Sequence, residues 1–171
     1  QYLPEDIAVC EVKRVDERFH SRYQAVEKTY LYRIHTGKIP EEFERRYVYD
    51  YTEPLDVNRM RKAAEYLCGT HDFKSFCGNK KMKKSTVRTI SRIQIKELPG
   101  EIQIYYTGNG FLQNMVRILT GTLIEIGDGR RTPEDVSEIL EAKNRERAGY
   151  TAPACGLTLL EVIYGKMVCN K

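Results

Sequence analysis

The sequence has few cysteines, and these show no pairing pattern. The 171 residues include five of them, at Cys10, Cys68, Cys77, Cys155 and Cys169. An odd number without a Cys-x-x-Cys pair does not suit the disulfide framework of a secreted domain. We therefore expect free thiols and a cytoplasmic protein.

The sequence also lacks a metal-ligand cluster and a long apolar run. Cys68, His71 and Cys77 lie close together, but no fourth ligand follows at the spacing of a zinc finger, so we expect no bound metal. No run of about 18 apolar residues and no charged-then-apolar leader occurs, which predicts neither a membrane span nor a signal peptide. The first residue is Gln1 rather than methionine. We therefore expect a chain that begins partway through a longer protein.

Acidic residues are missing from one part of an otherwise ordinary composition. With 41% hydrophobic and 30% charged residues, the chain has the composition of a single globular domain and not of a disordered or coiled-coil protein. Residues 74–96 contain eight basic and no acidic residues, a charge of +8. The remainder holds 20 of the 28 basic residues and all 24 acidic ones, so it carries −4 although the whole chain carries +4. This asymmetry indicates either a polyanionic partner or a lysine-rich solvated loop.

The hydrophobic pattern predicts strands and helices that do not alternate regularly. Strands are predicted over residues 7–15, 28–35, 87–98, 101–107 and 157–164. One helix is predicted between an N-cap at Asp56 and Gly69, one over the apolar residues 111–126, and one from an N-cap at Thr132 with Pro133 in its first turn. We therefore expect an α+β fold with a mixed, mostly antiparallel sheet and helices packed on one face.

One arginine stands in the predicted apolar helix. Gln113, Arg117 and Thr120 follow the spacing i, i+4, i+7, which predicts a polar stripe on one face. A buried guanidinium requires a carboxylate or phosphate in good geometry, and no acidic residue lies within a turn or two of Arg117. Its partner therefore comes from another segment, unless the side chain reaches solvent at the helix edge.

Two segments combine aromatic and basic side chains. Tyr30 lies in a predicted strand, where its ring either packs in the core or stacks on a nucleic-acid base. Residues 19–23 add Arg22 and two aromatic rings. His20 in this segment is a candidate general acid or base, but a histidine without a positioned partner is more often structural.

Five motifs occur in one order along the chain. They are Phe-His-Ser-Arg-Tyr-Gln-Ala at 19–25, Lys-Thr-Tyr at 28–30, His-Asp-Phe-x-Ser-Phe at 71–76, Gly-Phe-Leu-Gln-Asn-Met-Val-Arg-Ile-Leu-Thr-Gly at 110–121 and Thr-Ala-Pro-Ala-Cys-Gly-Leu at 151–157. In this order and spacing they resemble the tRNA pseudouridine synthase A (TruA) family from about Leu3 to Tyr164. Ser21 and Tyr23, where the family often has Ala and Phe, are conservative departures.

The resemblance implies an enzyme that isomerises uridine to pseudouridine at positions 38, 39 and 40 of the tRNA anticodon stem-loop, as a homodimer and without cofactor or metal. The family's nucleophilic aspartate lies in a Gly-Arg-Thr-Asp-Ala-Gly motif, which does not occur in these 171 residues. We therefore expect residues 1–171 to form a single C-terminal catalytic-domain piece that lacks the N-terminal domain and is inactive alone. The alternative is a non-catalytic RNA-binding module that keeps a synthase-like fold.

The resemblance also implies roles for individual residues. Arg117 would pair with the missing aspartate, and Tyr30 would lie against the target base and help to remove its C5 proton. Leu157 would pack beneath the uracil ring, unless it is an ordinary core leucine, and Arg22 and Gln113 are further substrate-binding candidates. The candidates for RNA-backbone contacts lie in the basic segment and are Lys80, Lys81, Lys83, Lys84 and Arg88.

Overall fold

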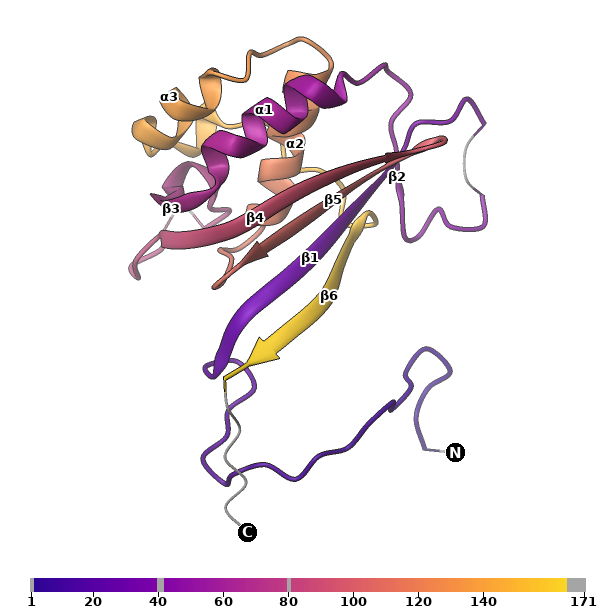
Figure 1. The fold of residues 1–171 in the computed structure, drawn as a ribbon, viewed down its shortest axis with the longest axis vertical. Coiled ribbons are helices and arrows are strands. Elements are labelled where there is room, and N and C mark those ends of the chain that lie inside the picture. The colour runs from indigo at the N-terminus through magenta and orange to yellow at the C-terminus, as the bar shows by residue number, and fades with distance from the viewer. Residues whose placement is uncertain (1, 40–41, 80, 166–171) are drawn as a thin grey trace.

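A computed structural model describes residues 2–39, 42–79 and 81–165, which are built on one six-stranded sheet (Figure 1). The strands are β1 (Ala25–His35), β2 (Tyr49–Asp50), β3 (Gly69–Asp72), β4 (Val87–Leu98), β5 (Glu101–Gly108) and β6 (Leu157–Tyr164). Their order is β2-β1-β5-β4-β3, and β6 also pairs with β1. Only the β1–β2 pairing is parallel among these described strands. The sheet is therefore mixed and mostly antiparallel, as predicted.

The helices lie together on one face of this sheet (Figure 1). They are α1 (Val57–Leu67), α2 (Met115–Gly127) and α3 (Asp135–Ala142), with short 3-10 turns at Phe73–Phe76 and Arg145–Arg147. The core fills the space between the two layers. Tyr32 and Ile34 of β1 are fully buried there, as are Ile118 and Leu119 of α2. The predicted α+β fold with helices on one face is confirmed.

Local sequence signals account for α1 and for the β4–β5 hairpin. The Asp56 carboxylate accepts the backbone N–H groups of Asn58 at 2.9 Å and Arg59 at 3.1 Å, so it caps α1 as predicted. The hairpin turns at Gly100, whose φ of +74° favours glycine. Both predictions are confirmed because each depends on residues close together in the chain.

The strand predicted over residues 7–15 is wrong. The structure has no strand there, and Ile7, Val9 and Val12 are exposed. This N-terminal stretch runs apart from the sheet (Figure 1), and it has no neighbouring strand with which to share backbone hydrogen bonds. Alternation of apolar and charged residues is therefore not sufficient for a strand.

Helix α2 begins later than predicted, at Met115 instead of residue 111. Asn114 precedes it with a φ of 57°, in the left-handed region, so the helix does not extend further toward the N-terminus. Gln113 consequently lies outside the helix and is exposed, whereas Thr120 is buried and shares a hydrogen bond of 2.9 Å with the Tyr106 hydroxyl. The predicted polar stripe does not exist as one surface.

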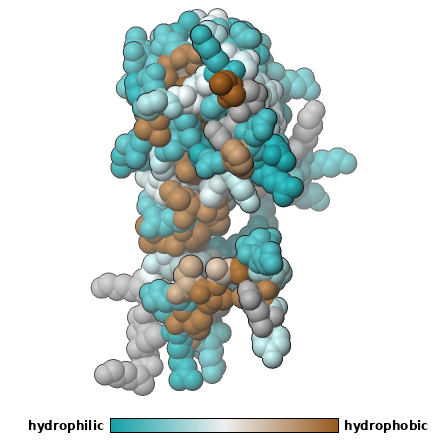
Figure 2. All heavy atoms as spheres, turned by 90° about the vertical axis from the view of Figure 1, so that its right-hand side faces the viewer, coloured by the Kyte–Doolittle hydropathy of each residue, from teal (hydrophilic) through white to brown (hydrophobic). Residues whose placement is uncertain are grey.

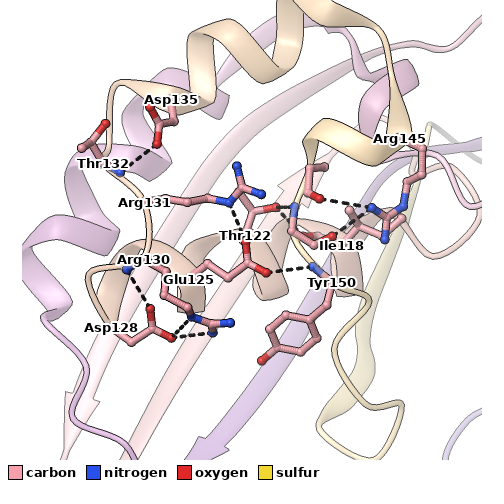
Figure 3. Close-up of polar contacts among 12 residues, drawn as sticks. Ile118, Thr122, Glu125, Asp128, Arg130, Arg131, Thr132, Asp135, Arg145 and Tyr150 are labelled. Carbon is pink, nitrogen blue, oxygen red and sulfur yellow. Dashed lines mark hydrogen bonds and ion pairs between the residues drawn. The ribbon is translucent and has the colours of Figure 1, made fainter.

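Helix α3 also begins later, at Asp135, so Thr132 is not its N-cap. Within the described chain, Thr132 does not accept a hydrogen bond from the helix with its side chain. Instead, its backbone N–H donates to the Asp135 carboxylate at 2.9 Å (Figure 3). Strands β2 and β3 were not predicted at all, since two and four residues are too few for a periodic pattern.

Large apolar side chains remain exposed at the β6 edge of the sheet. Leu159, Leu160 and Ile163 of β6 and Val26 of β1 are 42–53% exposed. Figure 2 shows that hydrophobic atoms gather in patches on the face it displays. No helix among the described residues is long and apolar enough to cross a bilayer.

Candidate functional site

Arg117 lies in the first turn of α2, where only neutral groups hold its half-buried side chain. Its Nε donates to the Ala152 carbonyl at 2.6 Å, and its Nη1 donates to Asn114 Oδ1 at 3.3 Å. The Arg117 carbonyl in turn accepts the Ala152 N–H at 3.1 Å. Within the described parts of the chain, no carboxylate forms an ion pair with Arg117 and its Nη2 has no hydrogen-bond partner. The described contacts therefore hold the guanidinium in place and leave its positive charge without a carboxylate partner.

Tyr32 of β1 attaches the loop that contains Ala152 and Pro153 to the sheet. Its hydroxyl donates to the Pro153 carbonyl at 2.7 Å, and the ring is fully buried. Burial raises the pKa of Tyr32 well above its usual value, and the nearby Arg117 charge opposes this only partly. Tyr32 therefore remains a neutral hydrogen-bond donor with a structural role.

Tyr30 lies two residues before Tyr32 and so on the same, helix-covered face of the sheet. Its ring meets the ring of Phe111 edge to face, with centroids 5.2 Å apart and planes at 83°. Tyr30 is half-buried, and burial raises the pKa of its phenol. Because Phe111 belongs to the loop that leads into α2, Tyr30 and Arg117 border the same loop. The ring packs against the core and remains partly exposed.

Leu157 begins β6 directly opposite Tyr32 on β1. It is half-buried and packs against the core, and both of its predicted roles stay predictions. Gly156 before it has no room for a side chain. A Cβ there would lie 2.6 Å from the Arg33 carbonyl oxygen and 2.7 Å from the Tyr32 ring. The last motif therefore needs its glycine in order to approach β1 closely.

The structure does not bring Arg22 to this group of residues. Arg22 is exposed in the turn before β1, with its guanidinium 5.9 Å from the Tyr23 ring. From the start of β1 to Tyr30 the strand rises about 17 Å, at about 3.3 Å per residue. Gln113 lies beside Asn114 in the loop before α2, with an exposed side chain and a carbonyl that accepts the Gly78 N–H at 2.8 Å.

The basic segment forms the connection between the first 3-10 turn and β4, and then β4 itself. Lys81, Lys83 and Lys84 are exposed, whereas Lys80 lies outside the described residues. Arg88 of β4 donates to the carbonyls of Ser85 at 3.0 Å and Val87 at 2.6 Å. A Cβ on Gly110 would lie 3.8 Å from the Arg88 side chain. Arg88, itself part of the basic segment, therefore lies next to the loop before α2.

A cavity of about 510 Å³ lies beside the basic segment. Its ionisable lining residues are Asp72, Lys74, Cys77, Lys84, Lys143, Arg145 and Glu146. Asp72 forms an ion pair with Lys143 at 3.3 Å and accepts the Thr86 hydroxyl at 2.5 Å. This hydroxyl and Lys143 hold the pKa of the Asp72 carboxyl below its usual value. Asp72 is thus committed to structural contacts.

The predicted free thiols are free in the described chain, at Cys10, Cys68, Cys77 and Cys155; Cys169 lies outside the described residues. His71 Nε2 lies 2.9 Å from the Cys68 carbonyl oxygen, so this ring nitrogen is engaged with the backbone. The described residues contain no group of three His, Cys, Asp or Glu side chains that could hold a metal ion.

Sequence reasoning missed Asn114 and Ala152, the two residues that hold the Arg117 side chain. Both lie in motifs that the sequence displays, at 110–121 and 151–157. The contact with Ala152 joins positions 35 residues apart and uses a backbone carbonyl. No residue-type pattern marks such a contact.

Comparison with known proteins agrees with these motifs. The sequence model of the tRNA pseudouridine synthase family matches residues 63–165. The tRNA pseudouridine synthase A 1 of Bacillus cereus and the tRNA pseudouridine synthase A of Bacillus subtilis are each 48% identical to the chain over 162 residues, covering 95% of this chain. The tRNA pseudouridine synthase A 2 of Clostridium tetani is 46% identical over 164 residues, covering 96% of this chain. The chain spans 66% of the length of each of these three relatives. The sequence motifs, the family match and these identities agree. The chain therefore belongs to the tRNA pseudouridine synthase A family.

Proposed function

We propose that this chain contributes Arg117 to the active site of an enzyme that converts uridine to pseudouridine at positions 38, 39 and 40 of the tRNA anticodon stem-loop. The observation that carries the proposal is the Arg117 guanidinium, which is held by Ala152 and Asn114 and has no carboxylate partner in the described residues. Membership of the family supports the same reaction class.

The contacts of Arg117 leave the two terminal nitrogens of its guanidinium, Nη1 and Nη2, suited to bind a carboxylate. Nε is engaged with Ala152 and one Nη1 hydrogen with Asn114, so Nη2 and the second Nη1 hydrogen remain for two carboxylate oxygens. A carboxyl group paired in this way has a lowered pKa and is ionised at neutral pH. It is also held in one direction, as a nucleophile needs. We assign this place to the aspartate of the Gly-Arg-Thr-Asp-Ala-Gly motif, contributed from outside the 171 residues.

The reaction needs no outside reactant, because it is an isomerisation. The aspartate attacks the uracil or the ribose, the bond between C1′ and N1 breaks, and the freed base turns. The bond to the aspartate then breaks and releases the carboxylate, a bond forms between C1′ and C5, and the C5 proton leaves while N1 gains one. Tyr30 lies against the base in this proposal. Burial raises the pKa of its phenol, and its partly exposed aromatic ring is suited to stack on the base.

The basic segment supplies the contacts to the RNA backbone in this proposal. Turning a nucleotide out of its stack costs about a few kcal/mol, which phosphate contacts must offset. The exposed Lys81, Lys83 and Lys84, together with Arg88 next to the loop before α2, are suited to make them.

We also propose that the complete protein is a cytoplasmic homodimer. The exposed apolar side chains of β6 and β1 support a partner at this edge, because such patches mark interaction surfaces. Sedimentation at several concentrations measures this association, and a protein that stays monomeric at all of them contradicts it.

A tritium-release assay on tRNA labelled at uridine C5 tests the proposed function. We expect no release by the chain alone and rapid release once its N-terminal part with the aspartate motif is restored. The matched control is the restored protein with that aspartate changed to asparagine, which should be inactive. Release by the chain alone would refute the argument for a missing nucleophile. A restored protein that binds tRNA without releasing tritium favours the non-catalytic RNA-binding module.

A further inference from the structure

The segment 148–152 follows one face of α2 and ends at the residue that holds Arg117. The Gly149 N–H donates to the Thr122 hydroxyl at 3.0 Å, and the Tyr150 N–H donates to the Glu125 carboxylate at 3.3 Å (Figure 3). At its end, the Ala152 carbonyl accepts Arg117 Nε at 2.6 Å. The segment therefore contacts α2 at Thr122, Glu125 and Arg117.

Two glycines allow the helix and the segment to touch through their backbones. A Cβ on Gly121 would lie 2.0 Å from the Tyr150 carbonyl oxygen. A Cβ on Gly149 would lie 2.7 Å from the Thr122 Cα. Neither neighbour can yield easily, because both of these atoms belong to the backbone. The segment and α2 therefore approach this closely only because both positions are glycine.

Arg145 also holds this segment. Its Nη1 donates to the Gly149 carbonyl at 2.9 Å and lies 3.4 Å from the Ala148 carbonyl, and its Nη2 donates to the Thr151 hydroxyl at 3.0 Å (Figure 3). No carboxylate of the described residues pairs with it within ion-pair distance. A planar guanidinium can reach two carbonyls and a hydroxyl at once, whereas a lysine ammonium cannot reproduce this fork.

We propose that Arg145 and Thr151 are positioning residues that aim the Arg117 guanidinium through Ala152. Thr151 is the direct neighbour of Ala152, so a fixed Thr151 sets where the Ala152 carbonyl points. That carbonyl takes Arg117 Nε and thereby turns the other edge of the guanidinium toward its carboxylate. The proposal rests on the proposed role of Arg117 in pseudouridine formation.

Small substitutions test this proposal without removing the core. Thr151→Val keeps the shape of the side chain but removes the acceptor for Arg145 Nη2, whereas Thr151→Ser keeps the hydroxyl. Arg145→Lys keeps the charge but removes the fork. The matched control is Arg147→Lys in the same 3-10 turn, since Arg147 is exposed and lies 4.0 Å from Glu138.

The first measurement is kinetic and uses the restored protein in the tritium-release assay. Misplacement of a reacting group by about an ångström costs on the order of 100-fold in rate. We expect kcat to fall about tenfold in Thr151→Val and up to about 100-fold in Arg145→Lys, with KM within about twofold. Thr151→Ser and Arg147→Lys should retain the parent kcat. An unchanged kcat in both Thr151→Val and Arg145→Lys overturns the proposal.

The second measurement is independent of activity. In the 171-residue chain, the Nε–H of Arg117 should give a slowly exchanging NMR signal because it is bonded to Ala152. We expect this signal to shift and exchange faster in Thr151→Val and Arg145→Lys, but not in Thr151→Ser. If the chemical shift and exchange rate of this signal stay unchanged while the variants lose thermal stability, Arg145 has a purely structural role and the proposal is overturned. If the restored protein makes no pseudouridine, the proposed function fails, and this NMR result alone decides whether Arg145 and Thr151 position Arg117.

Discussion

Replacing Gly121 with alanine should destabilise the chain, although alanine is the better helix former. The new Cβ would lie 2.0 Å from the Tyr150 carbonyl oxygen, so the segment 148–152 would have to move away from α2. Overpacking of this kind costs about 1–3 kcal/mol, and removal of the Gly149 hydrogen bond to Thr122 costs about 1 kcal/mol. The helix propensity of alanine offsets about 1 kcal/mol. We therefore expect a net decrease of about 1–3 kcal/mol in the free energy of unfolding.

Urea unfolding followed by circular dichroism measures this decrease as a lower midpoint at an unchanged slope. The control is Gly127→Ala at the C-terminal end of α2, where a Cβ would lie 3.0 Å from side-chain atoms of Leu55 and Met60. Because those flexible side chains can shift, we expect Gly127→Ala to stay within about 1 kcal/mol of the parent chain. A Gly121→Ala variant as stable as the parent chain would refute the close approach between α2 and the segment 148–152.

Three further predictions concern the cap, an acidic group and the basic segment. Asp56→Ala should lower the free energy of unfolding by about 1 kcal/mol in the same urea assay, because it removes the cap of α1; an unchanged midpoint would contradict the cap. Arg33 hydrogen-bonds Glu101 and holds the pKa of that carboxyl below its usual value. The stability from this pair is therefore complete above the ordinary pKa of glutamate and is lost as pH falls through the lower folded value. Glu101→Gln should flatten the acid side of the stability–pH curve, and an unchanged curve would show that the pair contributes nothing. Reversing Lys83 and Lys84 to Glu should reduce the slope of log binding constant for tRNA against log salt by about 0.9 for each phosphate that the protein no longer neutralises. An unchanged slope indicates a solvated loop instead.

The elements that could be predicted from the sequence are those with local causes. Helix α1 combines an N-cap at Asp56 with apolar residues on one face, and the β4–β5 hairpin turns at Gly100. The strand predicted over residues 7–15 has the right alternation but no partner strand, and pairing is a property of the whole fold. The start of α2 was missed because Asn114 adopts a left-handed conformation, which residue type alone does not reveal.

The candidate site was predictable in its chemistry but not in its geometry. The apolar surroundings of Arg117 indicate that it needs a partner from another segment, and the structure shows Ala152 and Asn114 holding it. A backbone carbonyl as partner has no signature in the sequence. The hydrogen bonds of Arg145 to Gly149 and Thr151 could not be predicted from the sequence either, because they depend on how the segment 148–152 lies along α2.

The proposed role of Arg117 is tested most directly by tritium release from uridine-labelled tRNA by the restored protein with Arg117→Ala. Removing the group that keeps the aspartate ionised and oriented should lower kcat on the order of 100-fold or more, by analogy with the removal of one charge-stabilising donor from an active site. The control variant Arg147→Ala, in an exposed turn, should retain the parent kcat. A kcat for Arg117→Ala close to that of the parent protein would remove Arg117 from the active site and contradict the proposed function.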